Sequence, residues 1–252
     1  MPEKSLTGKT ALITGASKGL GKAMALALAS EGVSVALVSR DVAQLEAVAR
    51  DVRALGARAE VFRADVAREE DVLQLEKEVS AVFPKLHILI NNAGVNIRKN
   101  ITEFTVDEWN TVIGTNLNSV FLMCRSFVPL MKGQGYGRIL NLTSIMSHVS
   151  LPGRSAYSAS KAGLLGLTRA LALELAEEGI TVVGISPGPI ATEMNLPLTT
   201  NPELNQQFVS RIAVGRWGKV EEVGKLAVYL CSDAAAFITG TDIIIDGGWC
   251  AQ

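Results

Sequence analysis

The sequence predicts an α/β protein with a doubly wound parallel sheet. Two observations predict it: short runs of apolar and β-branched residues recur along the chain, and amphipathic stretches of helical period separate them. Parallel strands need crossover connections, and right-handed crossovers on both faces produce an open sheet whose ligand site lies beyond the carboxyl ends of the strands. Functional residues are therefore expected just after strands.

Each predicted element follows from its pattern. The strand segments are continuous apolar runs, which is typical of strands buried on both faces, and they are Thr10–Thr14, Val33–Ser39, Arg58–Arg63, Ile88–Asn91, Arg138–Thr143, Thr181–Ser186 and Asp242–Asp246. The helical segments between them are Gly21–Glu31, Val42–Leu55, Glu69–Phe83, Val106–Met131, Ser155–Glu178 and Val220–Leu230. Segment Asn195–Gln207 contains Pro197 and Pro202 and is expected to be a mobile lid over the substrate rather than a core element.

Composition narrows the class of protein. The 252 residues contain no linker or low-complexity tract, so a single domain over residues 1–252 is expected. A formal net charge of -1 gives no electrostatic attraction to nucleic acid or to a membrane surface, which leaves small molecules or proteins as the expected partners. The three cysteines lack C-x-x-C spacing, so reduced thiols and no metal site are expected. No long apolar span occurs, and a cytoplasmic location is expected.

A glycine-rich turn follows the first predicted strand. Residues 14–21 read T-G-A-S-K-G-L-G and lead into an alanine-rich helix. Glycines at a strand-to-helix junction allow a tight turn and close approach of a pyrophosphate to free N–H groups at the helix N-terminus. The spacing is G-x-x-x-G-x-G rather than G-x-G-x-x-G, and an ordinary glycine-rich turn is the alternative. The predicted cofactor-binding residues here are Gly15, Ser17, Lys18, Gly19, Leu20 and Gly21.

The end of the second predicted strand bears on which dinucleotide binds. An acid at this place serves the adenosine ribose hydroxyls, whereas an arginine accommodates a 2′-phosphate. The chain has Ser39-Arg40 here, and Lys18 supplies a second cation. The pair predicts that NADP(H) is preferred over NAD(H). In the alternative interpretation both cations are solvated and Asp41 supplies the acid.

Polar residues after later strands form a candidate catalytic group. Tyr157 and Lys161 are four residues apart on a predicted helix, so their side chains lie on one face. Ser144 follows the strand that ends at Thr143. Asn116 interrupts the apolar pattern of a long helix, and a buried amide must find partners, so a structural role in kinking that helix is its alternative.

These residues as a set resemble the short-chain dehydrogenase/reductase family along essentially the whole chain. The resemblance rests on Thr14–Gly21, Asp65-Val66, Asn91–Gly94, Asn116, Ser144, Tyr157-x-x-x-Lys161 and Pro187-Gly188, in that order. It implies a Rossmann-type three-layer sandwich with a seven-stranded parallel sheet, an NAD(P) cofactor and a homotetramer. One departure is His87, which stands where the family commonly has Asp and puts a local structural hydrogen bond in doubt.

The resemblance also implies roles for the site residues. Tyr157 would be the general acid and base, with its pKa lowered by the ammonium of Lys161, and Ser144 would bind the substrate oxygen. Lys161 would also hold the nicotinamide ribose, and Asn116 would anchor a water in the proton relay. The remaining cofactor contacts would come from Asp65 and Val66 at the adenine, from Asn92, Ala93 and Gly94, from Pro187 and Gly188, and from Ile190 and Thr192 at the carboxamide.

Several features look like the sugar-acid branch of the family, the gluconate 5-dehydrogenases and 2-deoxy-gluconate 3-dehydrogenases. They are Arg98-Lys99, Ser144–Ser147, Gly215–Gly218 and Asp246–Trp249. Arg98 or Arg154 near the pocket could bind a substrate carboxylate, and the alternative is that both are rim charges. A 3-oxoacyl-[acyl-carrier-protein] reductase and a broad-range carbonyl reductase are alternative enzymes, and an NADP(H)-binding redox sensor is the non-enzyme alternative. His148 either lines the pocket or is incidental.

Overall fold

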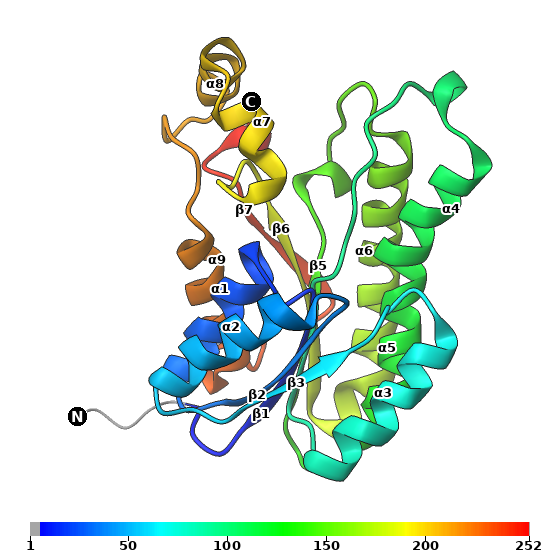
Figure 1. Ribbon diagram of the computed structural model, residues 1–252, viewed down its shortest axis with the longest axis vertical. Coiled ribbons are helices and arrows are strands. Elements are labelled where there is room, and N and C mark those ends of the chain that lie inside the picture. The colour runs from blue at the N-terminus through cyan, green and yellow to red at the C-terminus, as the bar shows by residue number, and fades with distance from the viewer. Residues whose placement is uncertain (1–5, 252) are drawn as a thin grey trace.

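The computed structural model describes residues 6–251 and contains one seven-stranded parallel sheet. The strand order is β3-β2-β1-β4-β5-β6-β7, so the chain starts near the middle and winds outward to both edges (Figure 1). The strands are β1 Thr10–Thr14, β2 Ser34–Ser39, β3 Ala59–Arg63, β4 Ile88–Asn91, β5 Gly137–Leu142, β6 Ile180–Pro187 and β7 Thr241–Ile245. The doubly wound sheet expected from the sequence is confirmed.

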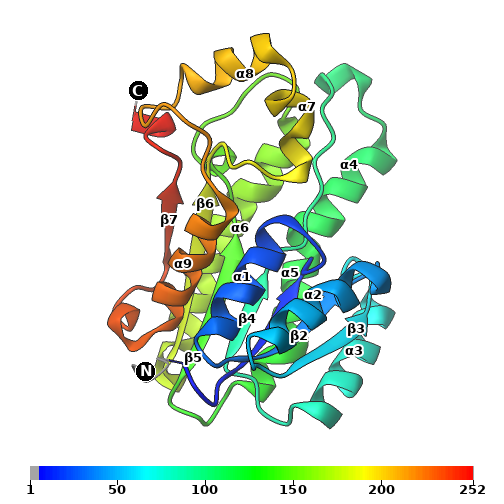
Figure 2. The same ribbon diagram turned by 60° about the vertical axis from the view of Figure 1, so that its left-hand side comes forward.

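Helices cover both faces of this sheet. Those of the described chain are α1 Gly19–Ser30, α2 Val42–Ala54, α3 Glu69–Val82, α4 Val106–Ile113, α5 Ser119–Phe127, α6 Ser155–Leu175, α7 Leu196–Thr199, α8 Pro202–Val209 and α9 Val220–Cys231. Helices α1, α2 and α9 lie on one face, and α3, α5 and α6 lie on the other (Figures 1 and 2). The three layers follow directly from strands that alternate with helices along the chain.

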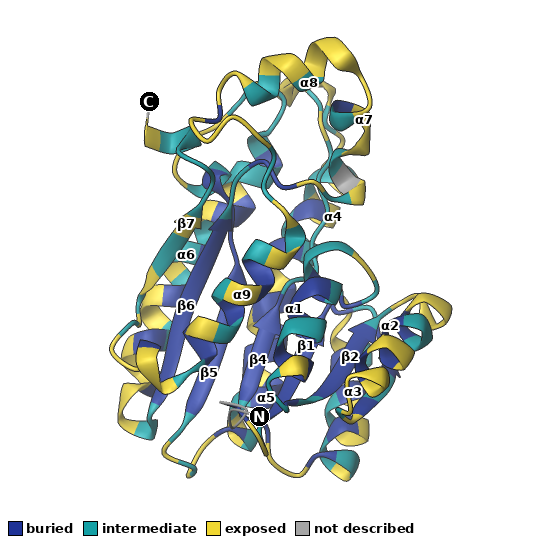
Figure 3. Ribbon diagram, turned by 90° about the vertical axis from the view of Figure 1, so that its left-hand side faces the viewer, coloured by how far each residue is buried: buried dark blue, intermediate teal, exposed yellow. Residues whose placement is uncertain are grey.

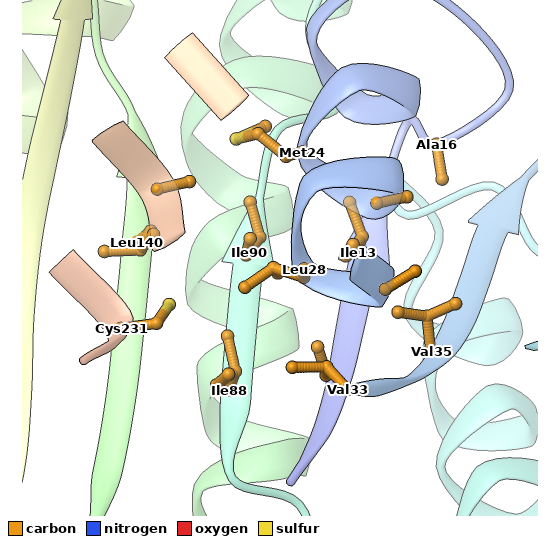
Figure 4. Close-up of a cluster of buried hydrophobic side chains, with 14 of the residues drawn as sticks. Ile13, Ala16, Met24, Leu28, Val33, Val35, Ile88, Ile90, Leu140 and Cys231 are labelled. Atoms are coloured by element: carbon orange, nitrogen blue, oxygen red, sulfur yellow. The ribbon is translucent and has the colours of Figure 1, made fainter. Parts of the chain in front are cut away.

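Two apolar cores hold the layers together, one on each face of the sheet. Neighbouring residues of β1 point to opposite faces, so Ile13 belongs to the core under α1 and α9 while Leu12 belongs to the core under α3, α5 and α6. Figure 4 shows the first core, where Met24 and Leu28 of α1 pack between strand residues such as Ile90. Each of these side chains is fully buried. Burial of side chains of this size contributes about 1.5–3 kcal/mol each to folding.

The last strand differs from the sequence expectation. All seven strands were expected to be buried on both faces, but β7 is only partly buried and Ile244 is 42% exposed. Its pairing explains the difference, because β7 is an edge strand that pairs with β6 alone. Strands β4 and β5, in the interior of the sheet, are buried throughout (Figure 3).

The long helix expected over Val106–Met131 is interrupted. A π-helical segment, Gly114–Asn118, separates α4 from α5, and a 3-10 turn follows from Val128 to Leu130. A π segment inserts an extra residue into the helical turn and changes which side chains face inward. Here the inward residue is Asn116, which is completely buried.

The segment expected to be a mobile lid contains two short helices. It contains α7 and α8, which lie at the end of the sheet toward which the strands point (Figures 1 and 2). Pro202 occupies the first turn of α8, where its missing N–H costs nothing, and the Asn201 side chain accepts hydrogen bonds from the N–H groups of Glu203 and Leu204. The prolines therefore begin helices here instead of preventing them.

His87, the departure from the family pattern, has a structural partner. Its Nδ1 accepts a hydrogen bond of 3.1 Å from the N–H of Thr10, at the start of β1. Burial and the charges of Lys9 and Lys85 lower the pKa of His87. The neutral imidazole thus supplies an acceptor at the bottom edge of the sheet.

Residues 6–251 contain no helix that is long and apolar enough to cross a membrane. The same residues contain no cluster of three or more His, Cys, Asp or Glu side chains that could hold a metal ion. The three thiols are free, and burial raises the pKa of both Cys124 and Cys231 to about 12.

Candidate active site

A cavity of about 460 Å³ runs along the carboxyl edge of the sheet. It passes from the glycine-rich turn after β1 to the segment after β6, which is where a doubly wound sheet places its ligand. Most predicted site residues line it: Gly15, Ser17, Lys18, Gly19, Leu20, Ser39, Arg40, Asp65, Val66, Asn92, Ala93, Gly94, Ser144, Tyr157, Lys161, Pro187, Gly188, Ile190 and Thr192. Gly21 and Asn116 are not among its lining residues, and both support the residues that are.

The glycine turn leaves room for a ligand by excluding side chains. Gly15 and Gly19 have φ values of +63° and +53°, in the left-handed region that favours glycine. At Gly21 a Cβ atom would overlap the carbonyl of Gly15 and lie 2.6 Å from Nδ2 of Asn92. The turn therefore packs backbone against backbone and opens onto the N-terminus of α1, a cradle that fits a pyrophosphate.

Asn92, which follows β4, holds the glycine turn in place. Its Nδ2 donates to the carbonyls of Thr14 and Gly15 at 2.9 and 3.1 Å. The hydroxyl of Thr14 accepts in return from the N–H groups of Asn92 and Ala93. The segments after β1 and β4 are thus locked together, and Asn92 both lines the cavity and shapes the glycine turn.

The far end of the cavity carries charged groups. Arg40 is 72% exposed and lies 3.5 Å from the carboxylate of Asp65. Asp41, the alternative acid, closes the N-terminus of α2, where its Oδ1 accepts from the N–H of Gln44 at 3.0 Å. Its carboxylate is engaged as a helix cap. The cation Lys18 also lines the cavity.

Ser144, Tyr157 and Lys161 lie together at the closed end. Ser144 begins a 3-10 turn, η4 (Ile145–Ser147), and its Oγ accepts from the N–H of Met146 at 3.1 Å. Tyr157 lies in the first turn of α6, and Lys161 follows one turn later with its Nζ 5.7 Å from the Tyr157 ring centre. Lys161 is buried and donates to the carbonyl of Leu142 at the end of β5. Strand β5 and helix α6 thus position the three groups.

The electrostatics of Tyr157 differ in part from the sequence expectation. The pKa of Tyr157 is raised above its ordinary value, because burial outweighs the opposing effects of a hydrogen bond with Ser144 and of the charges of Arg154 and Arg98. The sequence expectation was a pKa lowered by Lys161, and it is wrong both in the net direction and in the residue. Burial reduces the pKa of Lys161 itself to about 8, because desolvation disfavours the ammonium. Two arginines therefore join Ser144 in favouring the phenolate.

Asn116 joins two segments behind the catalytic group. Its Oδ1 accepts from the N–H of Val95 at 2.8 Å, and its Nδ2 donates to the carbonyl of Val95 and to Oγ of Ser160 at 2.9 and 3.1 Å. Gly94 packs against it, with an added Cβ only 3.3 Å from Oδ1. The buried amide has its partners, and it ties the segment after β4 to α6. This joining role differs from the kinking of the helix that was weighed as its alternative, and the role of Asn116 in holding a water stays a prediction.

Arg98 and Arg154 both line the cavity near Tyr157. Burial, together with repulsion from Arg98, lowers the pKa of Arg154 to about 10. Its Nη1 is buried without a hydrogen-bond partner among residues 6–251. A buried guanidinium N–H without a partner is costly, and an anionic ligand in the cavity would supply the acceptor.

Sequence reasoning missed part of the opposite wall. Phe208 of α8 stacks between Trp217 and Trp249, with ring centres 5.6 and 5.5 Å apart. All three aromatic rings line the cavity, together with Met146 and Leu151. The helix-start signal at Asn201-Pro202 could have revealed α8, but no local pattern shows that Phe208 meets two distant tryptophans.

Comparisons with known proteins cover nearly the whole chain. The family profile described as enoyl-(acyl carrier protein) reductase matches residues 15–250. The 3-oxoacyl-[acyl-carrier-protein] reductase of Staphylococcus epidermidis is 39% identical over 243 residues, covering 95% of this chain and 98% of that protein. The gluconate 5-dehydrogenase of Gluconobacter oxydans is 34% identical over 244 residues, covering 97% and 95%.

Solved structures give the same picture. A proposed gluconate dehydrogenase from Agrobacterium tumefaciens superposes with a TM-score of 0.96, at 35% identity and full coverage of both chains. A proposed NAD(P)-dependent gluconate 5-dehydrogenase from Beutenbergia cavernae, which contains bound NADP, has a TM-score of 0.94 at 35% identity and covers 99% of this chain and 100% of its own.

Fold, cavity and comparisons together define an oxidoreductase of the Rossmann-like α/β class that acts on CH–OH or carbonyl groups with a nucleotide cofactor. The chain belongs to the short-chain dehydrogenase/reductase family.

Proposed function

We propose that this protein interconverts a ketone and a secondary alcohol on a small substrate that carries a carboxylate, a sugar acid of the gluconate type, with NADP(H) as cofactor. The observation that carries the proposal is the pair Arg98 and Arg154 in the same cavity as Tyr157, with Nη1 of Arg154 buried and unpartnered. A planar guanidinium binds a carboxylate in two parallel hydrogen bonds and so fixes the substrate's orientation. A neutral ketone would leave this N–H unpaired.

The catalytic residues divide the chemistry among them. The bound nicotinamide supplies or takes the hydride. Tyr157 gives its phenolic proton to the carbonyl oxygen in reduction and recovers it in oxidation. Oγ of Ser144 accepts from Met146 and can donate its own proton, toward Tyr157 in this structure and toward the substrate oxygen when substrate is bound, where it would stabilise the charge that develops. Lys161 lines the cavity between these groups and the cofactor region.

The preference for NADP(H) rests on the charges at the far end of the cavity. Arg40 and Lys18 offer two cations to a 2′-phosphate, and the carboxylate of Asp41 is engaged at the N-terminus of α2. A ribose-binding acid at this position is therefore replaced by cations. The bound NADP of the Beutenbergia cavernae structure supports the same choice.

The test is a matched pair of substrates. With purified enzyme, 5-keto-gluconate and its methyl ester are compared as oxidants of NADPH and of NADH. The proposal expects kcat/KM to be about 10–100-fold higher for the acid than for the ester, which is the contribution of one charged hydrogen-bonded pair. Equal kcat/KM values for acid and ester would contradict a carboxylate site.

A second candidate function is reduction of a 3-oxoacyl thioester. The Staphylococcus epidermidis relative favours it, and so does the apolar wall formed by Met146, Leu151 and Phe208, against which an acyl chain could pack. Acetoacetyl thioesters are therefore included beside 5-keto-gluconate. Faster turnover of the thioester selects this second function, and cofactor binding without turnover of any carbonyl compound would select a redox sensor.

A further inference from the structure

A buried carboxylate on the edge strand β7 gathers polar groups from three other segments. Its Oδ2 lies 3.0 Å from Nε2 of His148 and 3.4 Å from Oγ1 of Thr143, and it also accepts from the hydroxyl of Ser186. The side chain of Asp242 is only 8% exposed. Buried carboxylates require such donors. We call Thr143, His148, Ser186 and Asp242 the Asp242 network.

Gly184 on β6 makes this convergence possible. A Cβ atom there would overlap the Cβ of Asp242 and lie 3.2 Å from Oγ1 of Thr143. The missing side chain lets the edge strand approach the end of β5. The network is thus built into the sheet, apart from His148, which reaches in from a loop with its side chain 30% exposed.

The network grips both ends of the η4 turn that Ser144 begins. The hydroxyl of Ser186 also lies 2.9 Å from the carbonyl of Ser144, an oxygen that already accepts from the N–H of Ser147 within η4. His148 is the residue that ends η4. Both ends of the turn therefore depend on contacts with β6 and β7, which are far away in the sequence.

The contacts of the network link the two ends of the turn. Ser186 lies within reach of three acceptors, the carbonyl of Ser144, the carboxylate of Asp242 and Oγ1 of Thr143. A carboxylate only accepts, so Nε2 of His148 must carry a proton to bond it. Asp242 therefore holds both Ser186, which contacts the beginning of η4, and His148, which ends it.

We propose that His148 is a positioning residue: by bonding Asp242 it holds the end of the η4 turn whose beginning Ser186 holds, and so fixes the turn that aims the Ser144 hydroxyl at the substrate. The inference rests on the role of Ser144 in the proposed function. His148 does not line the cavity; its ring bonds Asp242 behind it. Its effect on the reaction passes through Ser144 alone.

The experiment compares His148→Ala with His148→Gln, using NADPH and whichever of 5-keto-gluconate, an acetoacetyl thioester and a simple ketone is turned over fastest. Loss of the donor in His148→Ala should lower kcat about 10-fold, the effect of one hydrogen bond to a charged group. Glutamine retains an N–H donor, so its kcat should stay within about twofold of wild type. The Kd for NADPH and the Tm should not change. Ser150→Ala is the control. Ser150 lies in the same loop as His148, and the substitution removes the hydrogen bond between the hydroxyls of Ser150 and Ser158.

A double-mutant cycle separates positioning from general loosening. In single-turnover measurements with excess enzyme, His148→Ala should change the residual rate of Ser144→Ala by less than about twofold, because the group that it positions has gone. Equal losses in His148→Ala, His148→Gln and Ser150→Ala, or a full-rate His148→Ala enzyme beside a slow Ser144→Ala enzyme, would overturn the positioning role. A full-rate Ser144→Ala enzyme would instead contradict the proposed role of Ser144 itself.

Discussion

Arg40 and Asp65 face each other at the end of the cavity near β2 and β3, with Nη1 of the arginine 3.5 Å from the carboxylate. The two residues follow neighbouring strands, β2 and β3, and both line the cavity. The pair is solvated and contributes little to stability. The ion pair does hold the Arg40 guanidinium at the edge of the cavity, where a 2′-phosphate would compete with Asp65 for the guanidinium.

Arg40→Asp should reverse the cofactor preference. The change removes the cation and places a second acid beside Asp65, so a phosphate is repelled while ribose hydroxyls gain an acceptor. We expect kcat/KM for NADPH to fall about 10–100-fold while that for NADH stays or rises, as measured by steady-state kinetics with each cofactor. Lys22→Ala, which breaks a surface ion pair with Asp51, is the control. An unchanged ratio would disprove the phosphate role of Arg40.

Tyr157→Phe should abolish most of the turnover. Phenylalanine fills the same space but carries no proton, so kcat should fall about 10²–10⁴-fold. The NADPH dissociation constant, measured by fluorescence titration, should be nearly unchanged. Retention of more than a tenth of the wild-type rate would show that another group transfers the proton.

Arg154→Gln should act on both binding and pH dependence. Loss of the guanidinium should raise KM for a keto acid about 10–100-fold and leave that for its methyl ester unchanged. Since Arg154 lowers the pKa of Tyr157, its removal should also move the acidic limb of the pH–rate profile for alcohol oxidation, where the rate rises as Tyr157 loses its proton, to higher pH. An equal change of KM for acid and ester would place Arg154 outside the carboxylate site.

Gly21→Ala should destabilise the protein even though alanine is the better helix former. The new Cβ overlaps the carbonyl of Gly15, so the glycine turn must shift, at a cost of about 1–3 kcal/mol and with weaker cofactor binding. Gly166→Ala is the matched control. It lies exposed in α6 with nothing within 4 Å of its Cβ position and should stabilise by about 0.5–1 kcal/mol. Urea unfolding measures both, and equal signs would contradict the packing argument.

His87 should make stability fall at mildly acidic pH. Its pKa is lowered in the folded protein, so the unfolded chain binds more protons as the pH falls through the ordinary histidine pKa of 6.5. The free energy of unfolding should therefore decrease as the pH falls through this range. His87→Asn keeps an acceptor for Thr10 without titrating and should show a shallower decrease. The free energy of unfolding is measured for both proteins between about pH 7.5 and about pH 5.5, the range in which ordinary histidines titrate. An equal decrease in the two proteins would exclude this contribution of His87.

Most of the fold was predictable because its pattern is local. Strands β1 and β4 begin and end at the predicted residues, and the other strands differ by one or two residues at their ends. Continuous apolar runs mark them without reference to distant residues. The burial of β7 was overestimated because a strand's place in the sheet order is not written in its own sequence.

The site was predictable as a set of residues but less so as a geometry. Ser144, Tyr157 and Lys161 were located from their places after a strand and on one helix face, and they line one cavity. Arg98 and Arg154 are the cations that act on the pKa of Tyr157, and their effect depends on how two loops approach each other. Charge effects fall off over a few ångströms, so only that approach decides them.

The sequence by itself determined the alternation of strands and helices, the glycine turn and the residue types of the catalytic group, because each is set by contacts within a few residues of chain. Only the tertiary structure decided that Asn116 turns inward through a π segment and bonds Val95. It alone also decided that His148 bonds Asp242, 94 residues away, since such a bond depends on the packing of β7 against the rest of the sheet.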